Sequence, residues 1–220
     1  MMVQERDQNG NVIYYRGLVK HRVNVEFVGN NNTLLIHDEA KELSGSVKFY
    51  GDFGHFSLGA MSSFRGQVIV GDKCRVNIGN KTTVTKNCFI NTAEETDVII
   101  GDDCMIASDT IFRTHDSHPI FDVVTQTRIN IAQSIIIGNH VWLGDQVIVL
   151  GGARVEDGSI IGIRGLVTGI ITNNSIAVGV PARVIRKDIA WERPNLNKTK
   201  LNVLHDASEI ECSDYWNKTK

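Results

Sequence analysis

Residues 137–172 read IGNHVW LGDQVI VLGGAR VEDGSI IGIRGL VTGIIT, which divides into six consecutive hexads. Every hexad opens with an aliphatic residue, glycine takes the second place in three of them, and the fifth place is mostly small. Neither the 3.6-residue period of a helix nor the alternation of a hairpin produces this spacing. A period of six that is kept over so many residues is typical of a repeat architecture with one short strand and one turn per hexad.

The repeat extends upstream with interruptions. Further hexads open at Val70, Ile78, Val84, Ile100 and Ile106. Short apolar runs separated by Asn-rich and Gly-rich turns indicate irregular coils nearer the N-terminus. Three hexads make one triangular coil, so residues three hexads apart stack at about 4.8 Å, the spacing of strands in a sheet. Leu143 is therefore expected to lie over Ile161.

The hexad rhythm is broken between Arg113 and Ile136, where the chain reads RTHDSHPIFDVVTQTRINIAQSII. This break predicts a loop inserted over residues 113–136. Loops that project from a rigid scaffold often carry function, so chemistry is expected here first.

The hexad pattern ends at Ala182. We therefore expect one repeat domain over residues 1–182 and a C-terminal region over 183–220. That region is expected to form a short helix from Arg183 to Arg193 and then a polar tail.

The composition fits a globular chain with one sizeable core, since 42% of its 220 residues are hydrophobic and 22% are charged. A formal net charge of −2 and a pI near 6.4 indicate no binding of nucleic acid or of an anionic membrane, and predict an acceptor that is not a polyanion. The sequence has no apolar run long enough to span a membrane, and residues 1–10 lack a signal-peptide core. We expect a cytoplasmic protein.

Three of the four cysteines, Cys74, Cys88 and Cys104, occupy the small fifth place of a hexad, and no two cysteines form a C-x-x-C pair. A free cysteine behaves as a compact hydrophobic residue. The spacing therefore predicts buried, reduced thiols and neither disulfides nor a zinc site. Cys212 lies in the polar tail.

Three segments carry a resemblance to a known family: DSHPI over residues 116–120, IGNHVWLG over 137–144 and AVGVPARVIR over 177–186. In this order and spacing the chain resembles the hexapeptide-repeat acyltransferases, and among them the cytoplasmic O-acetyltransferases that modify sugars and polysaccharides. The resemblance implies an all-β, left-handed parallel β-helix. It also implies acetyl-CoA as co-substrate, no metal, and a homotrimer with CoA between adjacent prisms.

The resemblance implies that His118 is the catalytic base. A sugar hydroxyl is a poor nucleophile, and an imidazole with a reference pKa of about 6.5 can accept its proton and return it to the CoA thiolate. His115 is the rival base, and Asp116 or Asp122 is the candidate to orient the ring. Trp142, 24 residues beyond His118, is implied as a wall of the acetyl pocket. An aromatic wedge at a subunit contact is the alternative for Trp142.

Carried over by position, the implied CoA-binding residues are Asp145, Ile163, Thr168, Gly169, Arg183 and Arg186. The chain departs from the usual pattern twice: Ile163-Arg-Gly165 replaces Ala-Gly-Ser, and Gly169-Ile170 replaces Lys-Asp. The bulk of Ile163 narrows the expected pantetheine groove, and the missing lysine removes a phosphate contact. A solvated basic face is the alternative for the two arginines.

Asn91, Glu94 and Glu95 precede the hexad at Ile100 and are candidates to line the sugar site, with a solvated turn as the alternative for the acidic pair. The expected function is transfer of acetyl from acetyl-CoA to a carbohydrate hydroxyl, in a capsule or other surface polysaccharide or its precursor. Acetylation of a xenobiotic of the chloramphenicol type is the runner-up.

Two readings from other classes remain. A zinc lyase of the carbonic anhydrase type on the same fold would need His115, His118 and His140, but their spacing lacks the hexad register of such sites. A catalytically silent scaffold fits poorly with a loop histidine followed by Trp142. His140 is interpreted as structural or interfacial.

Overall fold

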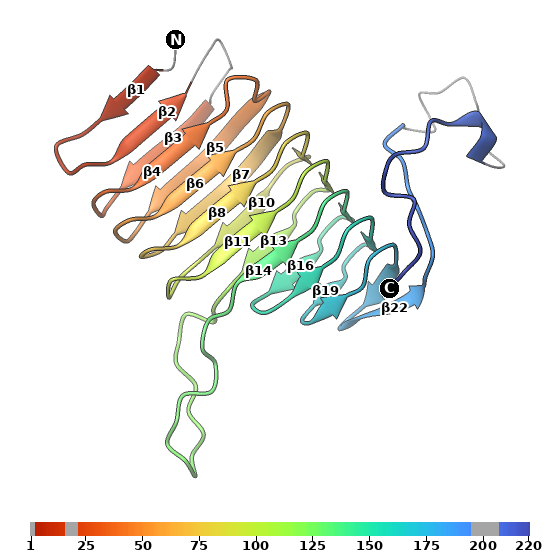
Figure 1. Cartoon of the computed structure of the whole chain (residues 1–220). Coiled ribbons are helices and arrows are strands. Elements are labelled where there is room, and N and C mark those ends of the chain that lie inside the picture. Colours follow the sequence, from red (N-terminus) through yellow and green to blue (C-terminus); the bar gives the residue numbers. More distant parts are fainter. Residues whose placement is uncertain (1–2, 16–21, 195–206) are drawn as a thin grey trace.

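The chain folds into a parallel β-solenoid with three flat faces, in a computed structural model that describes residues 3–15, 22–194 and 207–220 (Figure 1). Successive strands pass from one face to the next, and each pairs with the strand one coil further along. The strands form a 9-stranded sheet and a 13-stranded sheet.

The 9-stranded sheet is the first face. It contains, in order, β1 (Val3–Arg6), β2 (Val12–Tyr15), β4 (Thr33–Ile36), β6 (His55–Leu58), β8 (Arg75–Ile78), β11 (Asp97–Ile100), β14 (Ile135–Ile137), β17 (Arg154–Val155) and β20 (Ile170–Ile171).

The 13-stranded sheet wraps round the other two faces. The second face holds β9 (Thr83–Val84), β12 (Met105–Ile106), β15 (Trp142–Leu143), β18 (Ile160–Ile161), β21 (Ile176–Gly179) and β22 (Ala182–Arg186). The third face holds β3 (Arg22–Phe27), β10 (Cys88–Asn91), β13 (Ile111–Arg113), β16 (Ile148–Leu150) and β19 (Leu166–Val167). The long strands β5 (Glu42–Phe49) and β7 (Ser63–Val70) bend across both faces.

The register confirms the hexad interpretation. Leu143 pairs with Ile161 and Val149 with Val167, each three hexads on. The residue that opens every hexad from Ile137 to Val167 is buried in the core. Because strands stacked in register bring like residues together, the core is a column of aliphatic side chains running the length of the prism.

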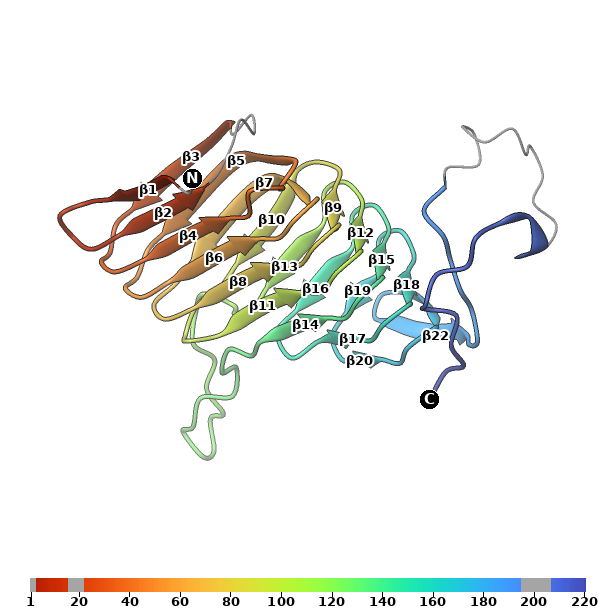
Figure 2. The same ribbon diagram turned by 45° about the horizontal axis from the view of Figure 1, so that its top comes forward.

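The break in the hexads is an inserted loop, as expected. It runs from residue 114 to 134, between β13 on the third face and β14 on the first, and projects from the prism (Figures 1 and 2). Within it, one isolated bridge joins Phe121 to Arg128. We call the edge of the prism between the third and first faces the loop corner.

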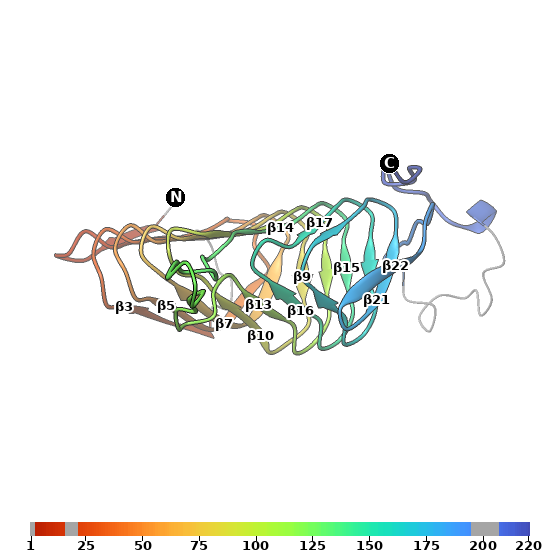
Figure 3. The ribbon, with the colours of Figure 1, turned by 90° about the horizontal axis from the view of Figure 1, so that it is seen from below.

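The helix expected from Arg183 to Arg193 is not formed. Residues 182–186 are strand β22, antiparallel to β21, and residues 187–194 are irregular. A single 3-10 turn, Ala207–Glu209, is the helical element of the described tail. Residues 187–194 and 207–220 lie at the end of the prism opposite the N-terminal coils (Figure 3). A strand forms here in place of a helix because the free edge of β21 offers a ladder of backbone hydrogen bonds, which an isolated turn of helix cannot match.

The three hexad cysteines are buried and free, as predicted, whereas Cys212 is exposed. Burial raises the pKa of the Cys88 thiol and raises that of Cys104 to about 12. Both therefore remain protonated at neutral pH, which fits a packing role.

Candidate active site

The base of the inserted loop is anchored by Glu94, in the turn between β10 and β11. Its carboxylate accepts hydrogen bonds from Arg128 Nη2 at 2.6 Å and from the main-chain N–H of Ala132 at 3.2 Å. These bonds, the Arg128 bond first, lower the pKa of Glu94. Glu94 was a candidate for sugar binding, but in this structure its two oxygens hold the loop against the coil.

Asn130 joins the two arms of the loop. Its Nδ2 donates to the main-chain oxygen of His118 at 2.9 Å and to Asp116 Oδ2 at 3.0 Å. Its Oδ1 accepts from the N–H of Ile120 at 2.8 Å. Asn130 thereby fixes the backbone at His118 and Ile120 and the side chain of Asp116. Nothing in the local sequence pattern had marked this residue.

The two loop histidines differ in environment. His118 is exposed, and no described residue hydrogen bonds to its ring, so its nitrogens face solvent. His115 is partly buried, its Nδ1 accepts from the N–H of Ser117 at 3.1 Å, and its buried Nε2 has no partner among the described residues. Desolvation and the nearby Arg113 guanidinium lower the pKa of His115.

The two carboxylates proposed to orient His118 have other partners. Asp116 bonds to Asn130, as above. Asp122 Oδ1 accepts from the main-chain N–H groups of Val124 at 2.9 Å and Thr125 at 2.7 Å. Asp122 therefore stabilises the turn at the tip of the loop.

Several predicted residues meet at the loop corner. Asn91 ends β10, is 9% exposed and pairs in register with Arg113, the last residue before the loop. Glu94 follows it, and His115, Asp116 and His118 lie in the loop itself. Glu95 is also in this turn, and its Oε1 lies 2.7 Å from Lys73 Nζ in a salt bridge.

Thr168 and Gly169 belong to the same corner, further along the stack, because they join β19 on the third face to β20 on the first. A side chain built on Gly169 would meet no atom within 4 Å. This corner is therefore open where the usual lysine is missing.

The remaining predicted residues lie elsewhere. Trp142 is on β15 of the second face, with 37% of its surface exposed. Asp145 and Ile163 lie at the corner between the second and third faces, where the N–H of Arg164 donates to Asp145 O at 2.8 Å. Ile163 is 67% exposed.

Arg183 and Arg186 are exposed on β22, at the end of the second face. The residues expected to bind CoA therefore lie at two corners of the prism and at the end of its second face. Within one chain the coil places His118 and Trp142 on different sides, so their expected proximity is not formed inside a single subunit.

His140 lies at the third corner, between the first and second faces, and is 1% exposed. Its Nδ1 lies 2.7 Å from Asp103 Oδ2, and its Nε2 lies 2.9 Å from Trp191 O. Both ring nitrogens are engaged, which fits a structural role and leaves none for zinc. Among the described residues, no group of three or more His, Cys, Asp or Glu side chains is arranged to hold a metal ion. In the same part of the chain, none of the helices has the length and apolarity of a membrane span.

No protein-family model matches the chain. A polysialic acid O-acetyltransferase of Escherichia coli O1:K1 / APEC is 36% identical over 154 residues, which are 70% of this chain and 48% of that relative. The chain therefore spans about half the length of this relative. The crystal structure of the polySia specific acetyltransferase NeuO superposes with a TM-score of 0.82 and 37% identity, over 87% of this chain and 88% of NeuO. The chain belongs to the hexapeptide-repeat acyltransferase family.

A second relative extends the likeness over most of the chain. A polysialic acid O-acetyltransferase of Neisseria meningitidis is 29% identical over 202 residues, covering 90% of this chain and 93% of the relative. The structure of the polysialic acid O-acetyltransferase OatWY matches with a TM-score of 0.74 at 27% identity, over 88% of this chain and 92% of that one. The likeness thus includes the irregular N-terminal coils as well as the regular hexads, and it confirms the left-handed parallel β-helix fold.

Proposed function

We propose that this protein transfers an acetyl group from acetyl-CoA to a hydroxyl of a surface polysaccharide or its precursor, in the cytoplasm. The observation that carries the proposal is the placement of His118: an exposed imidazole on a loop whose backbone Asn130 fixes at His118 O and at the N–H of Ile120. The kinship with polysialic acid O-acetyltransferases and with a galactoside O-acetyltransferase of Escherichia coli, 32% identical over 113 residues, supports a carbohydrate acceptor.

In the proposed reaction, His118 accepts the proton of the acceptor hydroxyl as its oxygen attacks the thioester carbonyl. The tetrahedral intermediate then collapses, the C–S bond breaks, and the imidazolium returns the proton to the departing thiolate. The products are the acetyl ester and CoA, and the enzyme ends unchanged. General acid-base catalysis of this kind contributes about 10² to 10⁴ in rate.

The proposed site is built between subunits of a homotrimer. A single chain carries the histidine loop at one corner and Trp142, Asp145, Ile163 and the β22 arginines on other sides, so a neighbouring prism is needed to bring them together. The loop supports this arrangement, because it exposes six large apolar side chains that a partner would cover: Ile120, Phe121, Val123, Val124, Ile129 and Ile131.

The acceptor can be acidic or neutral, and the two cases are separated by the test below. The net charge of −2 predicted an acceptor that is not a polyanion, whereas the relatives are named for polysialic acid, which carries one carboxylate per sugar. Net charge is a weak guide here, because a ligand responds to the local field of its site. We propose the polysaccharide class and include acidic and neutral glycans in the test.

The test measures release of free thiol from acetyl-CoA with oligosialic acid, a galactoside, maltose and chloramphenicol, each against a blank without acceptor. We expect acceptor-dependent release with at least one glycan and detection of its acetyl ester by mass spectrometry. Release with chloramphenicol alone would favour the xenobiotic reading, and no release above the blank with any glycan would reject the proposal.

A further inference from the structure

The imidazole of His140 is stacked between two aromatic rings from the C-terminal region. The ring of Trp191 lies on one side at 4.0 Å between centroids and 15° between planes. The ring of Tyr215 stacks at 4.6 Å and 1°. His140 lies in a turn of the solenoid, whereas Trp191 and Tyr215 come from two separate segments of the C-terminal region. Both segments therefore pack against one residue of the solenoid.

Hydrogen bonds fix Trp191 on His140 in both directions. His140 Nε2 donates to Trp191 O at 2.9 Å, because a carbonyl oxygen can only accept, and Trp191 Nε1 donates to His140 O at 3.0 Å. The next residue but one, Arg193, reaches back to the coil and donates to Asp103 Oδ1 at 2.5 Å, while Asp103 Oδ2 lies 2.7 Å from the imidazole.

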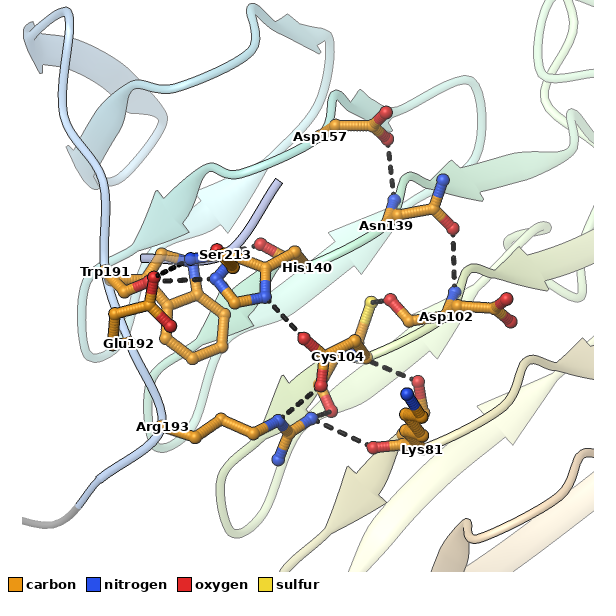
Figure 4. A network of polar contacts seen from close by, with 12 residues as sticks. Lys81, Asp102, Cys104, Asn139, His140, Asp157, Trp191, Glu192, Arg193 and Ser213 are labelled. Atoms are coloured by element: carbon orange, nitrogen blue, oxygen red, sulfur yellow. Dashed lines mark hydrogen bonds and ion pairs between the residues drawn. The ribbon is translucent and has the colours of Figure 1, made fainter. Parts of the chain in front are cut away.

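Figure 4 shows the same segment tied down on either side of this contact. Arg193 Nη2 donates to Lys81 O at 3.0 Å, and Glu192 Oε1 accepts from the N–H of Ser213 at 2.8 Å. Glu192 Oε1 also accepts from Trp216 Nε1 at 2.7 Å. Residues 191–193 are therefore held to the coil and to the returning tail by side-chain bonds at every position.

The ring of Trp191, held in this way, contacts Trp142. Its indole stands on the second face, where β12 and β18 flank its strand, and the ring of Trp191 meets it at 5.9 Å with 50° between planes. Trp191 itself is 7% exposed, whereas Trp142 is 37% exposed. A partly exposed indole on a flat sheet has few neighbours that restrict its rotamer. The ring of Trp191, which is itself held in place, is one such neighbour of Trp142.

We propose that Trp191 is a positioning residue for Trp142, and that His140 holds Trp191 in place. The proposal rests on the proposed function, in which Trp142 walls the acetyl pocket. Misplacing a pocket wall by about 1 Å costs up to about 10² in rate. The segment after β22 is thus a part of the acyl-transfer site, although none of its residues carried a motif.

The first test measures the geometry of the Trp142–Trp191 pair and does not depend on enzymatic activity. Two indoles 5.9 Å apart couple their far-ultraviolet transitions and give an exciton couplet in circular dichroism. Trp191→Phe and Trp142→Phe should each abolish the couplet, and His140→Leu should weaken it. Trp216→Phe is the matched control, because it removes an indole from the same tail that does not contact Trp142, and it should keep the couplet. A couplet that survives in Trp191→Phe would overturn the proposal.

The second test reads the reaction. Trp191→Ala should lower kcat by about 10-fold to 10², leave KM for acetyl-CoA within about twofold, and be largely rescued in Trp191→Phe, which keeps an aromatic ring against Trp142. Cys212→Ala, at an exposed position of the same tail that takes part in none of these bonds, is the control for activity and should match the wild type. A folded Trp191→Ala enzyme with wild-type kcat would overturn the proposal.

The two tests separate this inference from the proposed function. If the wild-type chain acetylates no acceptor, the proposed function fails, and the couplet in the four variants still decides whether the two indoles lie against each other and whether His140 keeps them there. If the wild type is active and the couplet behaves as expected, the kcat of Trp191→Ala decides whether that placement matters for transfer.

Discussion

The amide nitrogen of Asn130 donates to the main-chain oxygen of His118 at 2.9 Å, so the loop's return arm fixes the residue that we propose as the base. The same amide group holds Asp116 and Ile120, which places one side chain at the centre of the loop's hydrogen bonding. The position of His118 is therefore set by a long-range bond and not by the His-Pro sequence alone.

Removing this amide should impair catalysis more than folding. We expect Asn130→Ala to lower kcat by about 10-fold to 10², because His118 then loses its fixed backbone. Melting temperature should change little, since the loop lies outside the solenoid core. Gln126→Ala, at the exposed tip of the same loop, is the control and should match the wild type. Equal kcat in both variants would contradict a positioning role for Asn130.

The identity of the base can be tested with the two histidines. His118→Ala should lower turnover by about 10² to 10⁴ and leave acetyl-CoA binding almost intact, as expected for loss of a general base. His115→Ala should do much less. Steady-state kinetics together with calorimetric titration of CoA checks both, and a large loss confined to His115→Ala would reverse the assignment.

The anchor at Glu94 predicts a dependence of loop order on pH. Bonding to Arg128 lowers the pKa of Glu94 below its ordinary value of 4.5, so the carboxylate stays ionised in the folded state. The stabilisation is present above pH 4.5 and is lost as the pH falls through the lowered pKa. After correction for the intrinsic pH dependence of amide exchange, the protection of amide hydrogens over residues 114–134 should therefore fall on acidification.

Glu94→Gln is the companion variant. It should show the lower loop protection already at neutral pH, and its protection should respond less to acid. Exchange in the loop that is the same in Glu94→Gln and in the wild type at neutral pH would show that the ion pair does not anchor the loop.

Thiol reactivity should divide the cysteines into two groups. Burial raises the pKa of Cys74, Cys88 and Cys104, which leaves little thiolate at neutral pH, whereas Cys212 is exposed. Alkylation of the native protein should add one group, at Cys212, and denaturation should release the other three sites. Intact-mass analysis checks the count. Acetyl transferred to a core cysteine during turnover would instead contradict direct transfer between CoA and the acceptor.

Mixed oligomers test the site between subunits. A His118→Ala subunit keeps its CoA-side residues, and an Ile163→Ala, Arg183→Ala double variant keeps its histidine loop. Co-assembly should restore some activity, because a mixed trimer can contain an interface in which both halves are intact. Mixed trimers without recovered activity, or an active monomer, would show that each subunit builds its own site.

The hexads made the solenoid predictable from sequence. Burial of one aliphatic residue per hexad is a local, repeated requirement, so the register of Leu143 on Ile161 follows from spacing alone. The inserted loop was predictable for the same reason, as an interruption of the period. Handedness was not, because either hand keeps the same spacing, and only the family resemblance supplied it.

The contacts that could not be predicted from the sequence join segments that are far apart in the chain. His140 and Trp191 lie 51 residues apart, and neither the tail's composition nor its periodicity indicates where it packs. Glu94 was a candidate for the sugar site because it lies in an irregular stretch before the hexad at Ile100, yet its partner Arg128 comes from an aperiodic loop. The helix expected after Ala182 failed because pairing with β21 outweighs the local preference of five residues.

The two sheets each end in a reversed strand: β1 runs antiparallel to β2 at one edge, and β22 runs antiparallel to β21 at another. A second molecule stacking on either of these edges would meet a strand pointing the wrong way for the parallel ladder that joins the coils. At these two edges, growth of the stack into fibres is therefore disfavoured. The trimer that we propose would instead use the flanks of the prism, where the loop and the second face lie.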